Sequence, residues 1–113
     1  MQRPKKILVF TATYNEIGNI RNLILRIKRN NPKVHILIVD DNSPDGTAKE
    51  IYKLKQNIKN LFLVNRKKKL GLDTAHKLAY QFAIKKKYDY LITMDADLSH
   101  DPRAIKNFIK NLL

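Results

Sequence analysis

The sequence predicts an α/β protein built on a mainly parallel sheet of four strands, with helices on both faces. Short apolar runs rich in β-branched residues alternate along the chain with longer amphipathic segments. The apolar runs are nearly continuous, which is typical of parallel strands that are covered on both faces. A length of 113 residues suffices for one domain of this kind.

The predicted elements alternate from the N-terminus onward. The apolar runs expected to form strands are residues 6–12, 34–39, 61–64 and 90–94. Large apolar residues recur at helical spacing in residues 17–29, 47–56 and 74–86. Asp101 and Pro102 supply an N-cap and a first-turn proline for one more helix. Because that helical pattern reaches Leu113 without a capping signal, we expect the chain to be truncated at its C-terminal side.

Composition narrows the range of functions. The formal net charge is +13, which fits a nucleic acid, an anionic membrane surface or a phosphorylated substrate. No nucleic-acid-binding signature accompanies the charge, so we expect no nucleic-acid partner. The chain has no cysteine, which excludes disulfides and thiolate catalysis. No apolar run approaches the ~18–20 residues of a transmembrane helix, and we expect a cytoplasmic protein.

Polar clusters follow each predicted strand. They occupy residues 11–16, 40–47, 65–71 and 95–97. In a parallel α/β sheet, ligands bind in the crevice beyond the carboxyl ends of the strands. Any one cluster is compatible with ordinary turn chemistry, but four clusters on one rim predict a binding site.

Asp95 and Asp97 stand one residue apart where the fourth strand should end. By themselves they are equally compatible with a turn and N-cap before the next helix. As a pair of hard oxygen ligands, they suit Mg²⁺ or Mn²⁺ that also holds a substrate phosphate. Because the sequence contains neither of the common glycine-rich phosphate loops, we expect metal and basic side chains to hold the phosphate.

The other clusters leave two interpretations open. Asp40 and Asp41 either cap a turn or accept hydrogen bonds from a base or ribose. Tyr14 is either a packing residue or a stacking surface for a base. Residues 66–69 are either a solvated charge run or an electropositive clamp on a diphosphate.

Taken in order, these clusters resemble the nucleotide-binding half of family 2 glycosyltransferases, which have the Rossmann-like GT-A fold. Within that family they are most similar to the dolichol-phosphate (polyprenol-phosphate) mannosyltransferases. The matching segments are residues 13–16, 39–47, 69–75 and 94–102. By this resemblance, residues 1–113 are the N-terminal nucleotide-sugar-binding part of a catalytic domain.

The resemblance also implies roles for individual residues. Those expected to bind the nucleotide sugar are Ala12, Tyr14, Glu16, Val39, Asp40, Asp41, Arg66, Asp95, Ala96 and Asp97. Asp95 and Asp97 would be the DxD acids that hold the metal and serve catalysis, while Asp41 would bind the base with support from Asp40. The chain departs from the family pattern at Ala12, where proline is usual, and at Asp73, where glycine is usual.

The resemblance implies an enzyme that transfers a hexose with inversion to a polyprenyl or dolichyl monophosphate. Mannose from GDP-mannose is the leading donor, and the reaction would take place at the cytoplasmic face of a membrane. Another nucleotide-sugar donor or another acceptor is the main alternative. Two remote alternatives are a receiver-type phosphoacceptor domain, suggested by residues 91–95, and a basic nucleic-acid-binding module.

Overall fold

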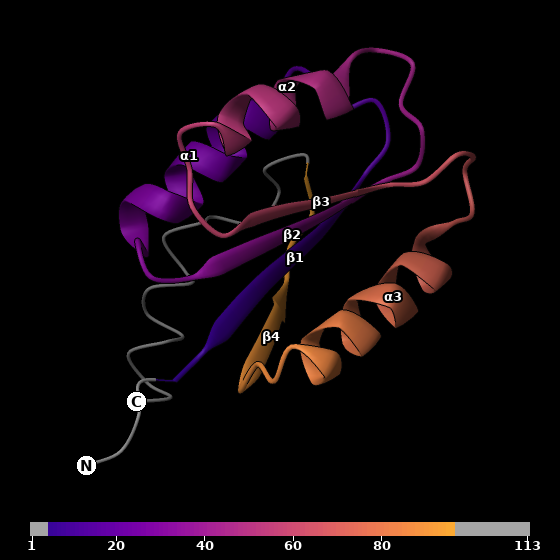
Figure 1. Ribbon diagram of the computed structural model, residues 1–113. Coiled ribbons are helices and arrows are strands. Elements are labelled where there is room, and N and C mark those ends of the chain that lie inside the picture. The colour runs from indigo at the N-terminus through magenta and orange to yellow at the C-terminus, as the bar shows by residue number, and fades with distance from the viewer. Residues whose placement is uncertain (1–4, 97–113) are drawn as a thin grey trace.

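A computed structural model describes residues 5–96, which form three layers with the sheet between the helices (Figure 1). The strands are β1 (Ile7–Thr13), β2 (His35–Asp40), β3 (Leu61–Asn65) and β4 (Tyr90–Thr93). The helices are α1 (Ile20–Asn30), α2 (Thr47–Lys55) and α3 (Leu72–Lys85). The further helix predicted after Pro102 lies outside the described residues, and so does Asp97.

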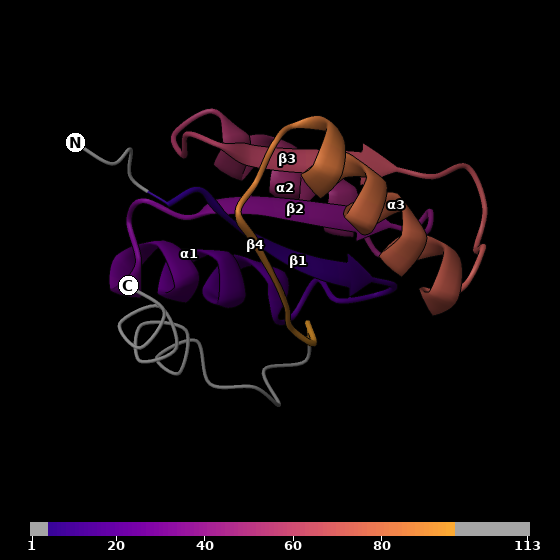
Figure 2. The same cartoon turned by 90° about the horizontal axis from the view of Figure 1, so that it is seen from below.

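The described strands form one parallel sheet in the order β3-β2-β1-β4. The chain therefore winds outward from β1 to β3 and then crosses to the other side of β1. Helices α1 and α2 cover one face of the sheet and α3 covers the other (Figures 1 and 2). The chain leaves β1 toward α1 on one face and enters β4 from α3 on the other, so the strand order reverses beside β1. Such a reversal point, at the carboxyl ends of the strands, is where α/β sheets bind ligands. The predicted α/β class, the parallel sheet and the helices on both faces are confirmed.

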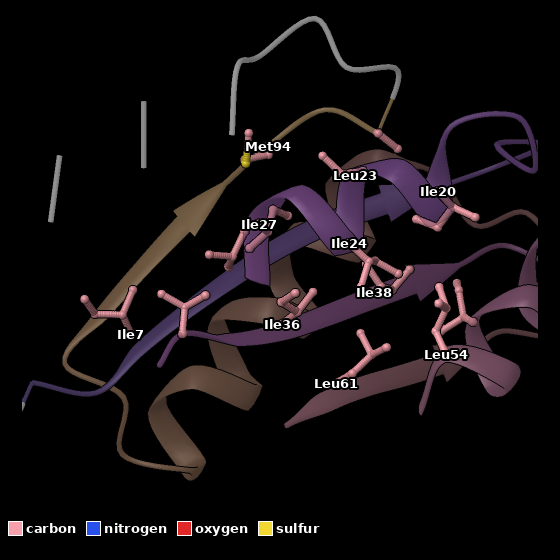
Figure 3. Close-up of a cluster of buried hydrophobic side chains, with 14 residues drawn as sticks. Ile7, Ile20, Leu23, Ile24, Ile27, Ile36, Ile38, Leu54, Leu61 and Met94 are labelled. Atoms are coloured by element: carbon pink, nitrogen blue, oxygen red, sulfur yellow. The ribbon is translucent and has the colours of Figure 1, made fainter. Parts of the chain in front are cut away.

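The core on the α1 and α2 side is made of large aliphatic side chains (Figure 3). Helix α1 buries one complete stripe, and Ile20, Leu23, Ile24 and Ile27 are each fully shielded from solvent. These residues recur every three or four positions, which places them on one face of the helix. Each such side chain contributes roughly 1.5–3 kcal/mol through burial, so this stripe fixes α1 on the sheet.

The core on the α3 side is built differently. Helix α3 faces the sheet with Ala75, Ala79 and Ala83, all of which are buried. Small side chains at four-residue spacing let the helix backbone approach the strands closely. The aromatic rings of Phe62 and Phe82 fill the margin, with their centroids 5.5 Å apart.

Several boundaries differ by a few residues from the predicted ones. The first three strands continue one residue further, to Thr13, Asp40 and Asn65, because these polar residues are still paired. Helix α1 begins at Ile20 rather than at residue 17, and the residues before it form a turn in which the Glu16 carbonyl accepts hydrogen bonds from the N–H groups of Asn19 and Ile20. The predicted strands nevertheless lie where expected. Within residues 5–96, no helix has the length and apolar character that crossing a bilayer requires.

Candidate functional site

The first three strands end at one level on the carboxyl side of the sheet. Thr13 pairs with Asp40, and Asp40 pairs with Asn65. The residue that follows in each strand is a predicted site residue: Tyr14, Asp41 and Arg66. The sheet register therefore brings together side chains that are far apart in the sequence.

Asp95 lies on the other side of β1. The last registered pair between β1 and β4 joins Phe10 to Thr93, and the Met94 N–H then donates to the Phe10 carbonyl at 2.9 Å. Asp95 follows and is exposed, whereas Ala96 packs into the α1-side core and is 4% exposed. Asp95 thus stands beside the crevice between β1 and β4.

Asp40 is completely buried at the end of β2. Its carboxylate accepts hydrogen bonds from the Thr13 hydroxyl at 2.6 Å and from the Ser43 hydroxyl and N–H at 2.6 and 2.9 Å. Three donors offset the cost of burying this polar group. Asp40 therefore ties the end of β1 to the loop after β2.

Asp41 pairs with Arg66, and both side chains are almost fully buried. The Arg66 Nε donates to Asp41 Oδ1, and the N–H groups of Leu70 and Gly71 donate to Oδ2 at 3.1 and 3.2 Å. Burial raises the pKa of Asp41, but the Arg66 and backbone hydrogen bonds outweigh it and leave that pKa below its ordinary value. Asp41 is therefore an ionised carboxylate at neutral pH.

Arg66 closes the loop that follows β3. Its Nη2 donates to the Gly71 carbonyl at 3.0 Å, and its Nη1 donates to the Thr74 hydroxyl at 2.8 Å. Its backbone N–H donates to the Asp40 carbonyl at 2.8 Å. Gly71 adopts a φ of 95°, a conformation that favours glycine, immediately before α3 begins. Both ends of the segment 66–71 are consequently fixed around one ion pair.

The loop after β1 is fastened to the loop after β2. The N–H groups of Asn15, Glu16 and Ile17 donate in turn to side-chain oxygens of the second loop. Their acceptors are the Ser43 hydroxyl at 2.8 Å, the Thr47 hydroxyl at 3.1 Å and the Asp45 carboxylate at 3.1 Å. Consecutive backbone groups of an otherwise exposed loop are thereby held in one conformation.

Tyr14 and Glu16 project from this fastened loop. The Tyr14 ring is 40% exposed, and the Lys69 Nζ lies 4.4 Å from its centroid. The Glu16 carboxylate accepts a hydrogen bond from Asn19 Nδ2 at 3.2 Å. Ala12 and Val39 are register partners just below the rim, and Val39 is 1% exposed in the α3-side core. Tyr14 therefore presents a partly exposed aromatic ring at the rim, where a ligand can reach it.

Residues 8–113 match the family described as Glycosyl transferase family 2. The chain belongs to this family. The relatives with curated names include "Polyprenol monophosphomannose synthase" from Mycolicibacterium smegmatis, 34% identical over 106 residues, which cover 93% of this chain and 40% of that protein. Another is "Undecaprenyl-phosphate mannosyltransferase" from Micrococcus luteus, 30% identical, with 93% and 43% covered.

Solved structures of glycosyltransferases share the fold. A mannosyltransferase from Pyrobaculum calidifontis, in complex with GDP-Man and Mn²⁺, superposes with a TM-score of 0.80 at 24% identity, over 93% of this chain and 31% of that one. Staphylococcus aureus TarS in complex with UDP gives 0.72 at 20% identity over the same shares. The expected family and its GT-A fold are confirmed. The chain spans about two fifths of the length of the curated relatives it matches.

The divalent metal expected in this family fits the one predicted metal ligand that lies within the described residues. Asp95 offers hard carboxylate oxygens beside the crevice, which suit Mg²⁺ or Mn²⁺. Within residues 5–96, no group of three or more His, Cys, Asp or Glu side chains is placed to hold a metal ion. A divalent ion here would therefore draw its other ligands from Asp97, which lies outside the described residues, and from a diphosphate and water.

The sequence placed the residues that hold this site in shape within the matching segments, but it assigned none of them an individual contact. These are Thr13, Ser43, Thr47, Gly71 and Thr74, together with Lys69 on the Tyr14 ring. A partial signal existed for the loop after β2, where Asp45, Gly46 and Thr47 form a turn sequence. The departure at Asp73 has a simple outcome, because this acid lies exposed in the first turn of α3 and complements the helix dipole.

Proposed function

We propose that this chain is the donor-binding part of a family 2 enzyme that transfers mannose from GDP-mannose to a polyprenyl monophosphate with inversion. The names of the relatives and the GDP-Man and Mn²⁺ complex of the P. calidifontis neighbour support this assignment. Another nucleotide-sugar donor is the alternative within the same family. The acceptor site would belong to the region that the relatives have beyond the part matched by this chain.

The single observation that carries the proposal is the alignment of Tyr14, Asp41 and Arg66 with Asp95 across the crevice. The first three follow strand ends that are in register, and Asp95 follows the strand on the other side of β1. Adjacent strands lie about 4.8 Å apart, so a nucleoside above β1 and β2 places its diphosphate next to β4. A nucleoside diphosphate has the length and charge distribution that this rim accommodates.

Asp41 retains capacity to bind the base. An ionised carboxylate offers about four lone-pair positions, and Arg66, Leu70 and Gly71 use three of them. The remaining position accepts a hydrogen bond from a base N–H group. Because Asp41 and its partners are already ordered, this acceptor needs no rearrangement when the base arrives.

Asp95 and Asp97 would hold the divalent ion, which when bound stabilises the negative charge on the departing diphosphate. The acceptor is a phosphate monoester with a second pKa near ~6, so it is largely dianionic at pH 7. A strong general base is therefore not required of this chain. Because the acceptor is a lipid, we place the reaction at the cytoplasmic face of a membrane, where contact would be peripheral.

Calorimetric titration with GDP and UDP, each with and without Mn²⁺, tests the proposal. We expect GDP to bind more tightly than UDP and Mn²⁺ to strengthen binding by about tenfold or more. Asp95→Asn should remove most of the Mn²⁺ effect while leaving the metal-free affinity nearly unchanged, because the base-binding residues are intact.

Glu50→Gln is the matched control, since it removes one carboxylate from the first turn of α2, where Glu50 pairs with exposed Arg21 and is not one of the predicted donor-binding residues. It should leave nucleotide and Mn²⁺ binding as in the native chain. If the affinity for GDP changes neither on addition of Mn²⁺ nor in Asp95→Asn, the metal assignment is wrong. Stronger binding of UDP would instead favour a different donor.

A further inference from the structure

Lys69 is an exposed lysine at the carboxyl rim, but its ammonium group contacts another side chain as well as solvent. It follows Lys67 and Lys68 in the loop after β3, and all three side chains are exposed. The Lys69 ammonium nevertheless lies over the ring of Tyr14, which belongs to the loop after β1. One charge of this loop therefore reaches across the carboxyl edge of β2.

The fixed ends of the loop explain why Lys69 reaches Tyr14. Asp41 Oδ2 accepts the N–H groups of Leu70 and Gly71, the two residues that follow Lys69. Arg66, at the start of the loop, is held by the same carboxylate. The backbone of Lys69 is thus anchored from both directions, while its long side chain is free to change partner.

The contact with Tyr14 leaves the charge of Lys69 available. A tyrosine ring attracts a cation through its quadrupole, but at an exposed site this attraction is weak and it does not neutralise the charge. A diphosphate carries full negative charges and accepts charge-assisted hydrogen bonds, which are much stronger. An ammonium group offered both partners would therefore bind the diphosphate.

We propose that Lys69 is a phosphate-binding residue that rests on the Tyr14 ring until a nucleoside diphosphate arrives and then transfers to the diphosphate. This inference rests on the proposed function, because it takes the base to stack on Tyr14. The base needs the ring face that Lys69 covers, and the diphosphate supplies the partner that Lys69 needs. The exchange favours ligands that bring both groups and disfavours a nucleoside that brings only the base.

The experiment compares a nucleoside with its diphosphate. Guanosine and GDP are titrated in the presence of Mn²⁺ into the native chain, Lys69→Gln and Lys68→Gln; uridine and UDP replace them if UDP is the tighter ligand. We expect Lys69→Gln to bind guanosine about two- to fivefold more tightly, because the ring is uncovered. The same variant should bind GDP about threefold or more weakly, because a phosphate partner is lost.

Lys68→Gln is the matched control, because it removes the same charge from the same loop, whereas the ammonium over the Tyr14 ring belongs to Lys69. It should leave guanosine binding unchanged and weaken GDP binding by less than Lys69→Gln. If Lys69→Gln shifts guanosine and GDP in the same direction, or leaves guanosine unaffected, the exchange does not occur. That result would leave the proposed function standing, provided that GDP still binds in a Mn²⁺-dependent way.

A second measurement follows Lys69 directly. In protein whose lysines carry ¹³C-labelled dimethyl groups, the Lys69 signal is identified by its absence in Lys69→Gln. We expect a ring-current shift of this signal that disappears in Tyr14→Leu and on addition of GDP or inorganic pyrophosphate. A Lys69 signal without a ring-current shift, or one that neither ligand moves, would overturn the inference.

Discussion

A lysine lies over a tyrosine ring at each end of the sheet, but the two contacts are built differently. At the amino ends of the strands, the Lys6 Nζ lies 4.5 Å from the ring centroid of Tyr88 and also donates to the Lys86 carbonyl at 2.8 Å. At the carboxyl ends, the Lys69 Nζ lies 4.4 Å from the ring centroid of Tyr14. The two ammonium-to-ring distances are nearly equal, but Lys6 has a further hydrogen-bond partner in the Lys86 carbonyl.

The amino-end contact belongs to a network that joins three elements. The Tyr88 hydroxyl and His35 Nδ1 are 2.7 Å apart, which links the chain after α3 to the start of β2. The Lys6 backbone N–H donates to the Asp89 carboxylate at 2.7 Å, and the rings of His35 and Phe62 meet edge to face. A group held by several partners does not change them readily. The difference indicates that the amino-end lysine stabilises the fold, whereas the carboxyl-end lysine is available to a ligand.

The largest effect on this comparison should come from breaking the ion pair under the carboxyl rim. Arg66→Met leaves the Asp41 carboxylate buried without its charged partner, and we expect the free energy of unfolding to fall by about 3 kcal/mol. Urea denaturation followed by circular dichroism measures the change. Arg21→Met removes an exposed partner of Glu50 and should cost less than about 0.5 kcal/mol. Equal losses in the two variants would show that the Asp41–Arg66 pair does not organise the rim.

Removing the two lysines tests the comparison directly. Lys6→Gln should lower the free energy of unfolding by about 1 kcal/mol, because the contact with Tyr88 and the hydrogen bond to Lys86 are both lost. Lys69→Gln should change it by less than about 0.5 kcal/mol, as is usual for an exposed side chain. Matched thermal and urea denaturation of the two variants would decide this. A larger loss for Lys69→Gln would reverse the assignment of roles.

The smallest effect should be a pH dependence at the amino end. Burial and then the charges of Lys28 and Lys6 lower the pKa of His35 below its ordinary value of about 6.5. The unfolded chain then binds the proton more readily, so this residue's contribution to stability is complete above pH ~6.5 and declines as the pH falls below it. The midpoint temperature of thermal unfolding should therefore decrease as the pH is lowered from 7.5 to 5.5. His35→Gln should make that temperature less dependent on pH. A pH dependence that His35→Gln leaves unchanged would show that another group is responsible.

The strands and the shared rim could be predicted from the sequence because both depend on local patterns. Residues 6–12 and 34–39 are almost continuous apolar runs, and few other structures bury such runs so completely. Once the strands are parallel, their carboxyl ends must share an edge, so Tyr14, Asp41 and Arg66 had to be near each other. The prediction succeeded because it needed the direction of the strands and not their exact register.

The contacts that shape the rim could not be predicted in this way. The Asp41–Arg66 pair joins residues 25 positions apart, and it forms only because Asp40 is registered with Asn65. A register shift of one residue between β2 and β3 would place these two side chains on opposite faces of the sheet. The start of α3 at Leu72, two residues before the predicted one, likewise depends on the positive φ of Gly71, which no apolar periodicity reveals. The assignment of Asp95 and Asp97 as metal ligands remains a prediction.

The loop that Asp41 holds at both ends has a consequence for the rate at which a ligand is captured. Because its backbone is ordered before binding, the positive potential of residues 66–69 is present throughout the life of the ligand-free protein. A fixed field attracts an anion from a distance of about one Debye length, roughly 10 Å at 0.1 M salt. Added salt should therefore slow the association of a nucleotide more than it hastens its departure.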